Sequence, residues 1–184
     1  MTIPFARLLL ATEHTEFDVG AEHVALELAR QLRVPLAGVV PIVSNVEYET
    51  VAPGLVSRME DGVRARLGAL HDDAARAGVE LDVRVRRGEE PWREIVEEAR
   101  VRGADLVIAR RRGKRGFLAH LMVGEMVGKV ATAAPCSVLL VPRAAHVWSR
   151  RVLAGIDGSR SGAEVARVAA RMALAAGLPL TIAT

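Results

Sequence analysis

The chain has 184 residues, of which 51% are hydrophobic, 26% charged and 3% aromatic, and this length suits one ordinary domain with part of another. The mixed composition excludes a disordered or collagen-like chain, and no apolar run approaches the ~20 residues of a membrane span. The net charge is only +3 and aromatic residues are few, so we predict neither a general nucleic-acid surface nor a base-stacking platform.

The N-terminal residues lack a charged start followed by a long apolar stretch, so we expect no secretory signal. The single cysteine, Cys136, cannot form an internal disulfide, which is typical of the reducing cytosol. We therefore expect a cytoplasmic protein. Cys136 precedes an apolar strand, and we interpret it as a small buried residue rather than a reactive thiol.

Short apolar runs alternate with helically spaced apolar residues along the first part of the chain. The predicted strands are residues 7–12, 36–43, 81–86, 106–109 and 137–141, and the predicted helices are residues 21–32, 55–77, 91–103 and 125–133. Loops are expected at 44–54 and 110–120. The apolar stripe of the second helix comprises Val56, Met59, Val63, Leu67 and Leu70, and that of the third Trp92, Ile95, Val96, Ala99 and Val101.

Strict alternation of strands and helices predicts a doubly wound α/β fold, a parallel sheet covered on both faces. The strand at 81–86 alternates apolar and charged residues, which places it near an edge of the sheet. Ligands of such sheets bind at the carboxyl ends of the strands where the strand order reverses. The loops after Ala11 and Ala109 are therefore the candidate site.

The order of elements restarts after residue 143. The sequence pattern of residues 151–159 resembles that of residues 7–15. A predicted helix at 163–176 then leads to a further apolar run. About 36 residues remain there, whereas a full copy needs roughly 140. We predict one domain at 1–143 and an incomplete second repeat at 149–184.

Several segments resemble the universal stress protein family, particularly its tandem-repeat members. They are the opening strand, the loop 109–116, Val123-Gly124-Glu125-Met-Val, and Ala134-Pro-Cys-Ser-Val-Leu-Leu-Val-Pro142. The resemblance implies a five-stranded doubly wound parallel sheet, a cytoplasmic location and dimers. Some members of that family bind ATP or AMP, others do not, and most have no established catalytic activity.

In nucleotide-binding members a strand leads into Gly-x-x-Gly, then nine residues, then Gly with Ser or Thr at a helix start. The glycines let backbone N–H groups approach phosphate oxygens. The strand end at Ala109 puts Arg110 at the first glycine position and Gly113 at the second, with ten residues before Gly124. The other alignment starts at Gly113 and Gly116 and leaves only seven. We prefer the first, because the strand end is a physical anchor.

Two acidic residues also depart from the family. Glu13 replaces the usual Asp that contacts the nucleotide, and Glu125 stands where Ser or Thr belongs. A carboxylate suits an empty helix N-terminus, but at ~4 Å it repels a phosphate charge by about 4 kcal/mol. Either the loop arginines turn inward and offset this, or Arg110 or Arg112 pairs with Glu125 in the phosphate position. The candidate cofactor-binding residues are Ala11, Thr12, Glu13, Val39, Arg110, Arg112, Gly113, Gly116, Gly124 and Glu125.

The remaining candidates have simpler interpretations. We interpret the basic run 110–115 as a solvated loop with local ion pairs rather than a site for nucleic acid or anionic lipid. The second copy's Asp157-Gly158-Ser159 predicts a turn with Ser159 as a helix N-cap. The five histidines have no metal-ligand spacing, so we predict surface or loop positions and no metal site for His14, His23, His71, His120 and His146.

Two hypotheses of function follow from these observations. The first is a non-enzymatic stress-response module that acts through dimerisation and partner binding, with a degraded nucleotide site and no cofactor. The alternative is an ATP- or AMP-binding protein with slow ATPase activity. We expect the apolar strand Val138–Val141 to pair across a homodimer or with the partial second copy, because a bare apolar edge favours association.

Overall fold

The computed structural model describes residues 5–51, 54–111 and 125–184. The chain divides into two compact units, Arg7–His146 and Val147–Thr184. In the described ranges no helix combines the length and apolar character that a bilayer crossing requires.

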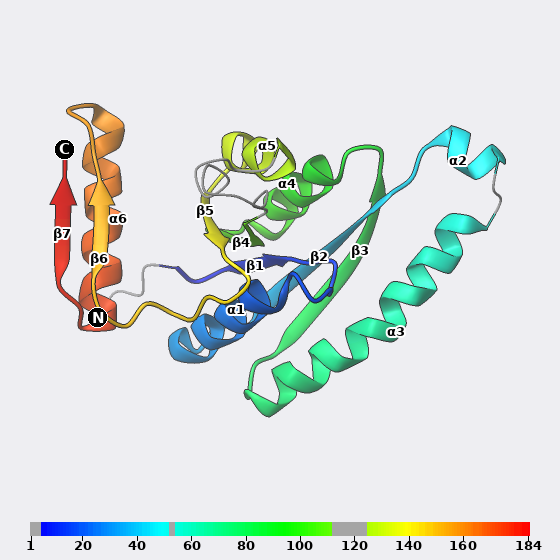
Figure 1. The fold of residues 1–184 in the computed structure, drawn as a ribbon, viewed down its shortest axis with the longest axis horizontal. Coiled ribbons are helices and arrows are strands. Elements are labelled where there is room, and N and C mark those ends of the chain that lie inside the picture. Colours follow the sequence, from blue (N-terminus) through cyan, green and yellow to red (C-terminus); the bar gives the residue numbers. More distant parts are fainter. Residues whose placement is uncertain (1–4, 52–53, 112–124) are drawn as a thin grey trace. The chain divides into compact units, whose positions relative to one another are not determined.

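The first unit is built on a five-stranded parallel sheet with the order β3-β2-β1-β4-β5 (Figure 1). This is the predicted doubly wound arrangement, in which strand order reverses between β1 and β4. Its strands are β1 (Leu8–Ala11), β2 (Leu36–Val43), β3 (Leu81–Gly88), β4 (Leu106–Arg110) and β5 (Ser137–Val141).

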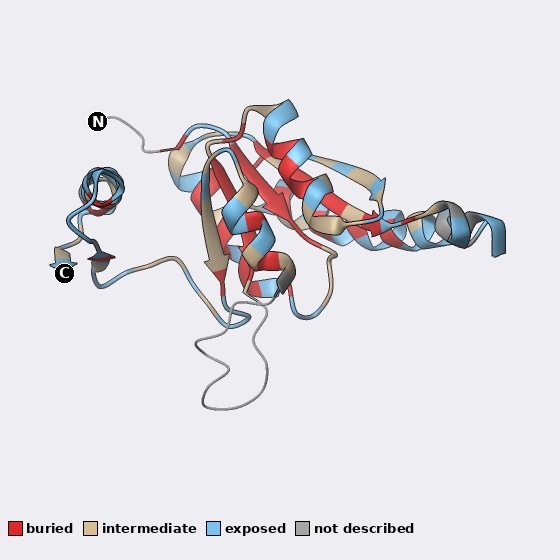
Figure 2. Cartoon of the chain, turned by 90° about the horizontal axis from the view of Figure 1, so that it is seen from above, coloured by how far each residue is buried: buried red, intermediate tan, exposed pale blue. Residues whose placement is uncertain are grey.

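Helices cover both faces of this sheet, α1 and α3 on one and α4 and α5 on the other (Figure 1). The helices are α1 (Val19–Leu32), α2 (Val46–Val51), α3 (Leu55–Arg76), α4 (Pro91–Arg102) and α5 (Glu125–Ala133). The central strands are buried (Figure 2), and Leu9, Val39 and Val107 are fully inaccessible to solvent. Two-sided burial explains why β1 and β4 appear in the sequence as continuous apolar runs.

The alternating strand β3 lies at the sheet edge, as predicted. Three expectations were wrong. Residues 44–54 contain the short helix α2, because the turn-forming Pro53 and Gly54 come only after it. Arg110 extends β4, where it pairs in register with Val141.

The third error concerns the exposed residues of two helices. Val101 of α4 is 57% exposed, and the buried position on that side of the helix is held by Glu98. Met59 of α3 is 42% exposed, whereas Val63 and Leu67 are buried as predicted. The apolar type of Val101 and Met59 indicated burial, but their angular position on the helix places them toward solvent.

Glu98 is fully buried between α4 and the edge strand β3. Its oxygens lie 3.0 Å from Arg86 Nη1, 2.8 Å from Arg102 Nε and 3.8 Å from Arg84 Nη1. Burial alone raises the pKa of Glu98, but the hydrogen bonds donated by Arg102 and Arg86 outweigh it and hold the pKa below its ordinary value. The carboxylate therefore remains ionised. It links α4 to Arg84 and Arg86 of β3, with Arg102 of α4 as its third partner.

Gly20 lies where α1 meets the chain that leaves β5. A Cβ at this position would overlap the carbonyl oxygen of Pro142 and lie 2.6 Å from that of Arg143. Gly20→Ala is therefore expected to destabilise the fold by about 1–3 kcal/mol through overpacking, although Gly→Ala within a helix normally stabilises. Urea denaturation measures the difference.

Gly68 in α3 is the matched control, because a Cβ there meets nothing within 4 Å. Gly68→Ala should leave the urea midpoint unchanged or raise it. A Gly20→Ala variant as stable as the wild type would show that the backbone at residues 142–143 can shift without a loss of stability.

The second unit consists of β6 (Val152–Gly155), α6 (Arg160–Ala176) and β7 (Leu180–Ala183), with the two strands parallel. The strand–helix–strand order is the one predicted. Ser159 caps α6 by accepting a hydrogen bond from Gly162 N at 3.2 Å, as expected, so the helix begins at Arg160 rather than at residue 163. Among the described strands, β6 and β7 pair only with each other, and β5 only with β4.

Candidate functional site

The carboxyl ends of β1, β2 and β4 bring the predicted residues of the first loop together. Ala11 lies in register with Val39 on one side and with Ala109 on the other. Thr12 N donates a hydrogen bond to the Val39 carbonyl at 3.1 Å, which extends the ladder by one residue. The chain then leaves the sheet at Glu13, at the edge where parallel sheets bind ligands.

Arg110 fills this edge with a buried guanidinium, only 8% of the residue being exposed. Its Nη2 lies 2.8 Å from Glu13 Oε2, and its Nη1 lies 3.3 Å from Asp18 Oδ2 and 3.1 Å from Thr15 Oγ1. Asp18 is 1% exposed and also accepts hydrogen bonds from the amide and hydroxyl of Thr15. Arg110 thus ties the end of β4 to the loop between β1 and α1.

Beside these contacts, the described residues line a small cavity. Its volume is about 20 Å³, the space of a single water molecule, and residues 112–124 lie outside the described part of the chain. The cavity is lined by Ala11, Thr12, Glu13, Pro41, Ile95, Ala109, Arg110 and Met126.

The described part of the chain therefore assembles half of the predicted site. Ala11, Thr12, Glu13, Val39 and Arg110 gather at one edge, as the sequence predicts. The backbone of Glu125 begins α5, but its side chain lies outside the described residues, as do Arg112, Gly113, Gly116 and Gly124 entirely. Pairing of Arg110 or Arg112 with Glu125 therefore stays a prediction, and the described partners of Arg110 include Glu13, Thr15 and Asp18.

A second polar cluster lies beside the first, on the α1 side. Thr12 Oγ1 donates to Glu22 Oε1 at 2.6 Å, and His14 Nδ1 lies 3.0 Å from the same oxygen. The backbone N–H of His14 donates to Thr12 Oγ1 at 2.8 Å, with His14 in the left-handed region at φ 50°. His14 occupies a loop, as predicted, but its ring is bonded to a buried carboxylate.

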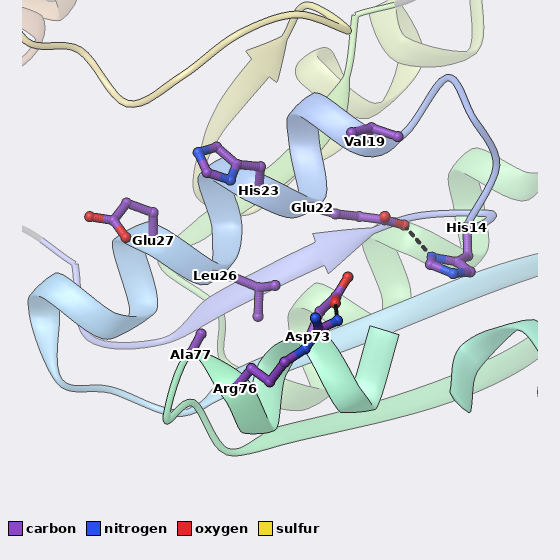
Figure 3. Close-up of a pocket in the computed structure, with 9 residues that line it drawn as sticks. All are labelled: His14, Val19, Glu22, His23, Leu26, Glu27, Asp73, Arg76 and Ala77. Carbon is purple, nitrogen blue, oxygen red and sulfur yellow. Dashed lines mark hydrogen bonds and ion pairs between the residues drawn. The ribbon is translucent and has the colours of Figure 1, made fainter. Parts of the chain in front are cut away.

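Figure 3 shows the cleft that this cluster borders, with Glu22 pointing toward His14. The cleft has a volume of about 560 Å³ and lies between α1 and the C-terminal end of α3. It is lined by His14, Val19, Glu22, His23, Leu26, Glu27, Asp73, Arg76 and Ala77.

Sequence reasoning missed Asp18 and Glu22, which supply the buried carboxylates of the two clusters. One signal was available: the residues are four positions apart, which places them on the same face of α1. Acidic residues in a first helical turn usually stabilise the helix N-terminus from solvent. Here both are buried, Asp18 at 1% and Glu22 at 7% exposure.

Comparison with known proteins gives a family and a set of related folds. The universal stress protein family model matches residues 4–142. A universal stress protein solved in complex with cAMP is 22% identical, with a TM-score of 0.61 over 77% of this chain and 99% of that one. Universal stress protein UspA from Lactobacillus plantarum is 17% identical, with a TM-score of 0.62 over 74% and 97%.

A functionally unknown protein from Pseudomonas aeruginosa PAO1 is 18% identical, with a TM-score of 0.71 over 98% of this chain and 61% of that one. No curated protein matches the sequence significantly. The structural likenesses show the fold, and the family model covers most of the chain. The chain therefore belongs to the universal stress protein family.

Proposed function

We propose that this protein is a non-enzymatic regulatory module of the stress response that acts in the cytoplasm through dimerisation and partner binding, with a degraded nucleotide site. The observation that carries the proposal is the buried guanidinium of Arg110, held by Glu13 and Asp18. In nucleotide-binding relatives a glycine is expected in place of Arg110, and its backbone approaches the nucleotide.

The contacts of Arg110 oppose nucleotide binding in two ways. Glu13 occupies the position of the acidic residue that meets the nucleotide, and here it pairs with Arg110 Nη2 at 2.8 Å. A nucleotide must break this pair before Glu13 can contact it. The negative charge of Glu125 adds repulsion of about 4 kcal/mol for a phosphate ~4 Å away, which is close to a thousandfold in affinity.

The alternative is that the chain binds ATP or AMP and hydrolyses ATP slowly. It is supported by the structural neighbour in complex with cAMP and by the gathering of Ala11, Thr12 and Glu13 at the edge where that fold binds ligands. Under this alternative, Arg110 releases its carboxylates and turns toward the phosphates.

Calorimetric titration with ATP, AMP and cAMP separates the two proposals. The wild type is expected to show no saturable binding in the micromolar range, whereas Arg110→Gly combined with Glu125→Ser is expected to bind at least tenfold more tightly, because both obstructions are removed. Arg111→Gly is the control for removing a neighbouring positive charge. Micromolar binding by the wild type that the double variant does not improve would favour the alternative.

We also propose that β5 forms the dimer contact. It lies at an edge of the five-stranded sheet, and Val138, Leu139 and Leu140 are only half-buried there. A bare apolar edge strand pairs readily with a second copy, and a lysine on such an edge prevents it.

Leu139→Lys is therefore expected to halve the mass in solution, measured by light scattering on a sizing column. Val101→Lys, at a position 57% exposed on α4, should leave the mass of the wild type unchanged. A wild-type monomer, or a dimer that withstands Leu139→Lys, would contradict pairing through β5.

We further propose that residues 149–184 belong to a second repeat. Its order β6-α6-β7 parallels β1-α1-β2, and Asp157-Gly158-Ser159 at the end of β6 fits the family's first-strand signature. The Pseudomonas protein, which this chain matches over 98% of its own length, is consistent with a tandem arrangement.

A further inference from the structure

Residues 142–151 connect β5 to β6 and form neither helix nor strand. The first five of them, residues 142–146, pass beside α1 (Figure 1) and belong to the first compact unit, which ends at His146. We name residues 142–146 the strap. The other five, residues 147–151, lead to β6. The contacts of the strap therefore determine how much of this connection is held against the first unit.

The strap lies directly against α1. Gly20 of α1 has room for no side chain, because a Cβ there would lie 2.6 Å from the carbonyl oxygen of Arg143. The rings of His23 and His146 meet edge to face, with their centroids 5.3 Å apart. Both the backbone and a side chain of the strap are thus in contact with the helix.

Arg143 also attaches the strap to the loop that precedes α1. Its Nη2 lies 3.1 Å from Glu16 Oε2, and its guanidinium carbon lies 5.2 Å from the centroid of the Phe17 ring. All three side chains are more than half exposed. An exposed ion pair or cation–π contact contributes little to stability by itself, so these contacts hold the strap only while the loop keeps Glu16 and Phe17 in place.

Arg110 holds the same loop from the inside. Its guanidinium bonds Glu13, Thr15 and Asp18, and the two residues that contact the strap lie between Thr15 and Asp18. Thr15 Oγ1 joins the two sets of contacts, because it accepts hydrogen bonds from Arg110 Nη1 at 3.1 Å and from the Phe17 amide at 3.3 Å. Arg110 and Asp18 are buried, whereas the loop's contacts with the strap are exposed. The buried arginine therefore sets the conformation on which the strap depends.

We propose that Arg110 controls the attachment of the strap through this loop. While Arg110 binds Glu13 and Asp18, the loop presents its two strap-binding residues, and the free connection between the units is limited to residues 147–151. When Arg110 leaves these carboxylates, the loop loses its buried support and the strap detaches, so the free connection extends over residues 142–151. Five more residues add up to roughly 17 Å of reach. The proposal is independent of the proposed function, because it rests only on the contacts of Arg110 and of the strap.

Trypsin cleavage after Arg143 tests the proposal. Cleavage requires a released segment, so its rate follows the population of the detached strap. Arg150, which is exposed and lies outside the strap, provides the internal reference, and mass spectrometry gives the initial rates of the first cuts at both sites. Arg110→Met is expected to raise the ratio of cleavage after Arg143 to cleavage after Arg150 at least fivefold over the wild type.

Leu36→Ala is the matched control for a general loss of stability. Leu36 is 1% exposed and begins β2, at the opposite end of the strands from the loop, so its truncation destabilises the core without removing a contact of the strap. Its cleavage ratio is expected to stay within twofold of the wild type. A ratio in Arg110→Met no higher than that in Leu36→Ala overturns the proposal.

Glu16→Gln combined with Phe17→Ala removes the contacts of Arg143 directly. This variant is expected to raise the cleavage ratio at least threefold and to leave the urea midpoint unchanged, since both side chains are exposed. An unchanged cleavage ratio would show that these contacts do not hold the strap, and the proposal would be wrong.

Circular dichroism establishes whether Arg110→Met folds. If it does not, Thr15→Val serves in its place, because it removes the hydroxyl that accepts from both Arg110 and the Phe17 amide. Its cleavage ratio is expected to rise at least threefold over the wild type. A folded Thr15→Val variant with the wild-type ratio contradicts control of the strap through this loop.

Discussion

Replacing Arg110 with methionine is expected to lower the free energy of unfolding by about 3–5 kcal/mol, the cost of leaving a buried charge without its partner. The charge in question is Asp18, which is 1% exposed and lies 3.3 Å from Arg110 Nη1. Thr15 still donates two hydrogen bonds to that carboxylate, so the loss is expected toward the lower end of the range. Urea denaturation monitored by circular dichroism measures it.

A double-mutant cycle shows whether Asp18 is the cause. Arg110→Met combined with Asp18→Asn removes both charges, and it should be destabilised by less than the sum of the single variants, with a coupling of about 0.5–3 kcal/mol. Arg143→Met is the control, because its pair with Glu16 is exposed on both sides and is worth ~0–1 kcal/mol. Additive losses at Arg110 and Asp18 would mean that the pair contributes nothing beyond packing.

The contacts of Arg110 stabilise the fold and, under the proposed function, also prevent nucleotide binding. Under the proposed function, the contacts to Glu13 and Asp18 that fix the loop between β1 and α1 also oppose nucleotide binding at this edge. An Arg110→Gly variant is therefore expected to gain space for a ligand while losing stability. Such opposition between stability and function is common in proteins.

The framework of the fold was predictable from the sequence because buried parallel strands have an unmistakable composition. Leu8–Ala11 and Leu106–Ala109 are uninterrupted apolar runs between helical patterns, and such runs occur where helices cover both faces of a sheet. The alternation in Leu81–Arg86 likewise marked an edge strand. The hydrophobic pattern of the sequence alone therefore predicted the layers of the fold and the edge of the sheet at which the candidate site residues lie.

The partners of the buried charges were not predictable in the same way. Arg110 was placed in a loop, since a charged residue after an apolar run usually faces solvent, and its partner Asp18 lies 92 positions away in the chain. Glu98 stands among apolar residues of α4 and was left unassigned for the same reason. Periodicity shows which face of a helix is buried, but not that two opposite charges from distant elements meet there.

Glu98→Gln is expected to cost about 3 kcal/mol of unfolding free energy at pH 7, near the lower limit for breaking a buried pair because its arginine partners are partly exposed. The glutamine amide cannot accept from Arg86 and Arg102 at both ends, and it carries no charge to hold Arg84. Urea denaturation at pH 7 measures the loss. Glu97→Gln on the same helix removes an exposed pair with Arg100 and is expected to cost under about 1 kcal/mol.

The pH dependence of the free energy of unfolding distinguishes an electrostatic role of Glu98 from a packing role. Its pKa in the folded protein is below the ordinary value of 4.5, so its contribution is fully present above that pH and is lost as the pH falls through the folded pKa. The gap in stability between wild type and Glu98→Gln should therefore be constant from pH 7 to about pH 5 and narrow below pH 4.5. A gap that keeps its size down to pH 3 would indicate that Glu98 acts by packing, and that the three arginines hold the edge strand without it.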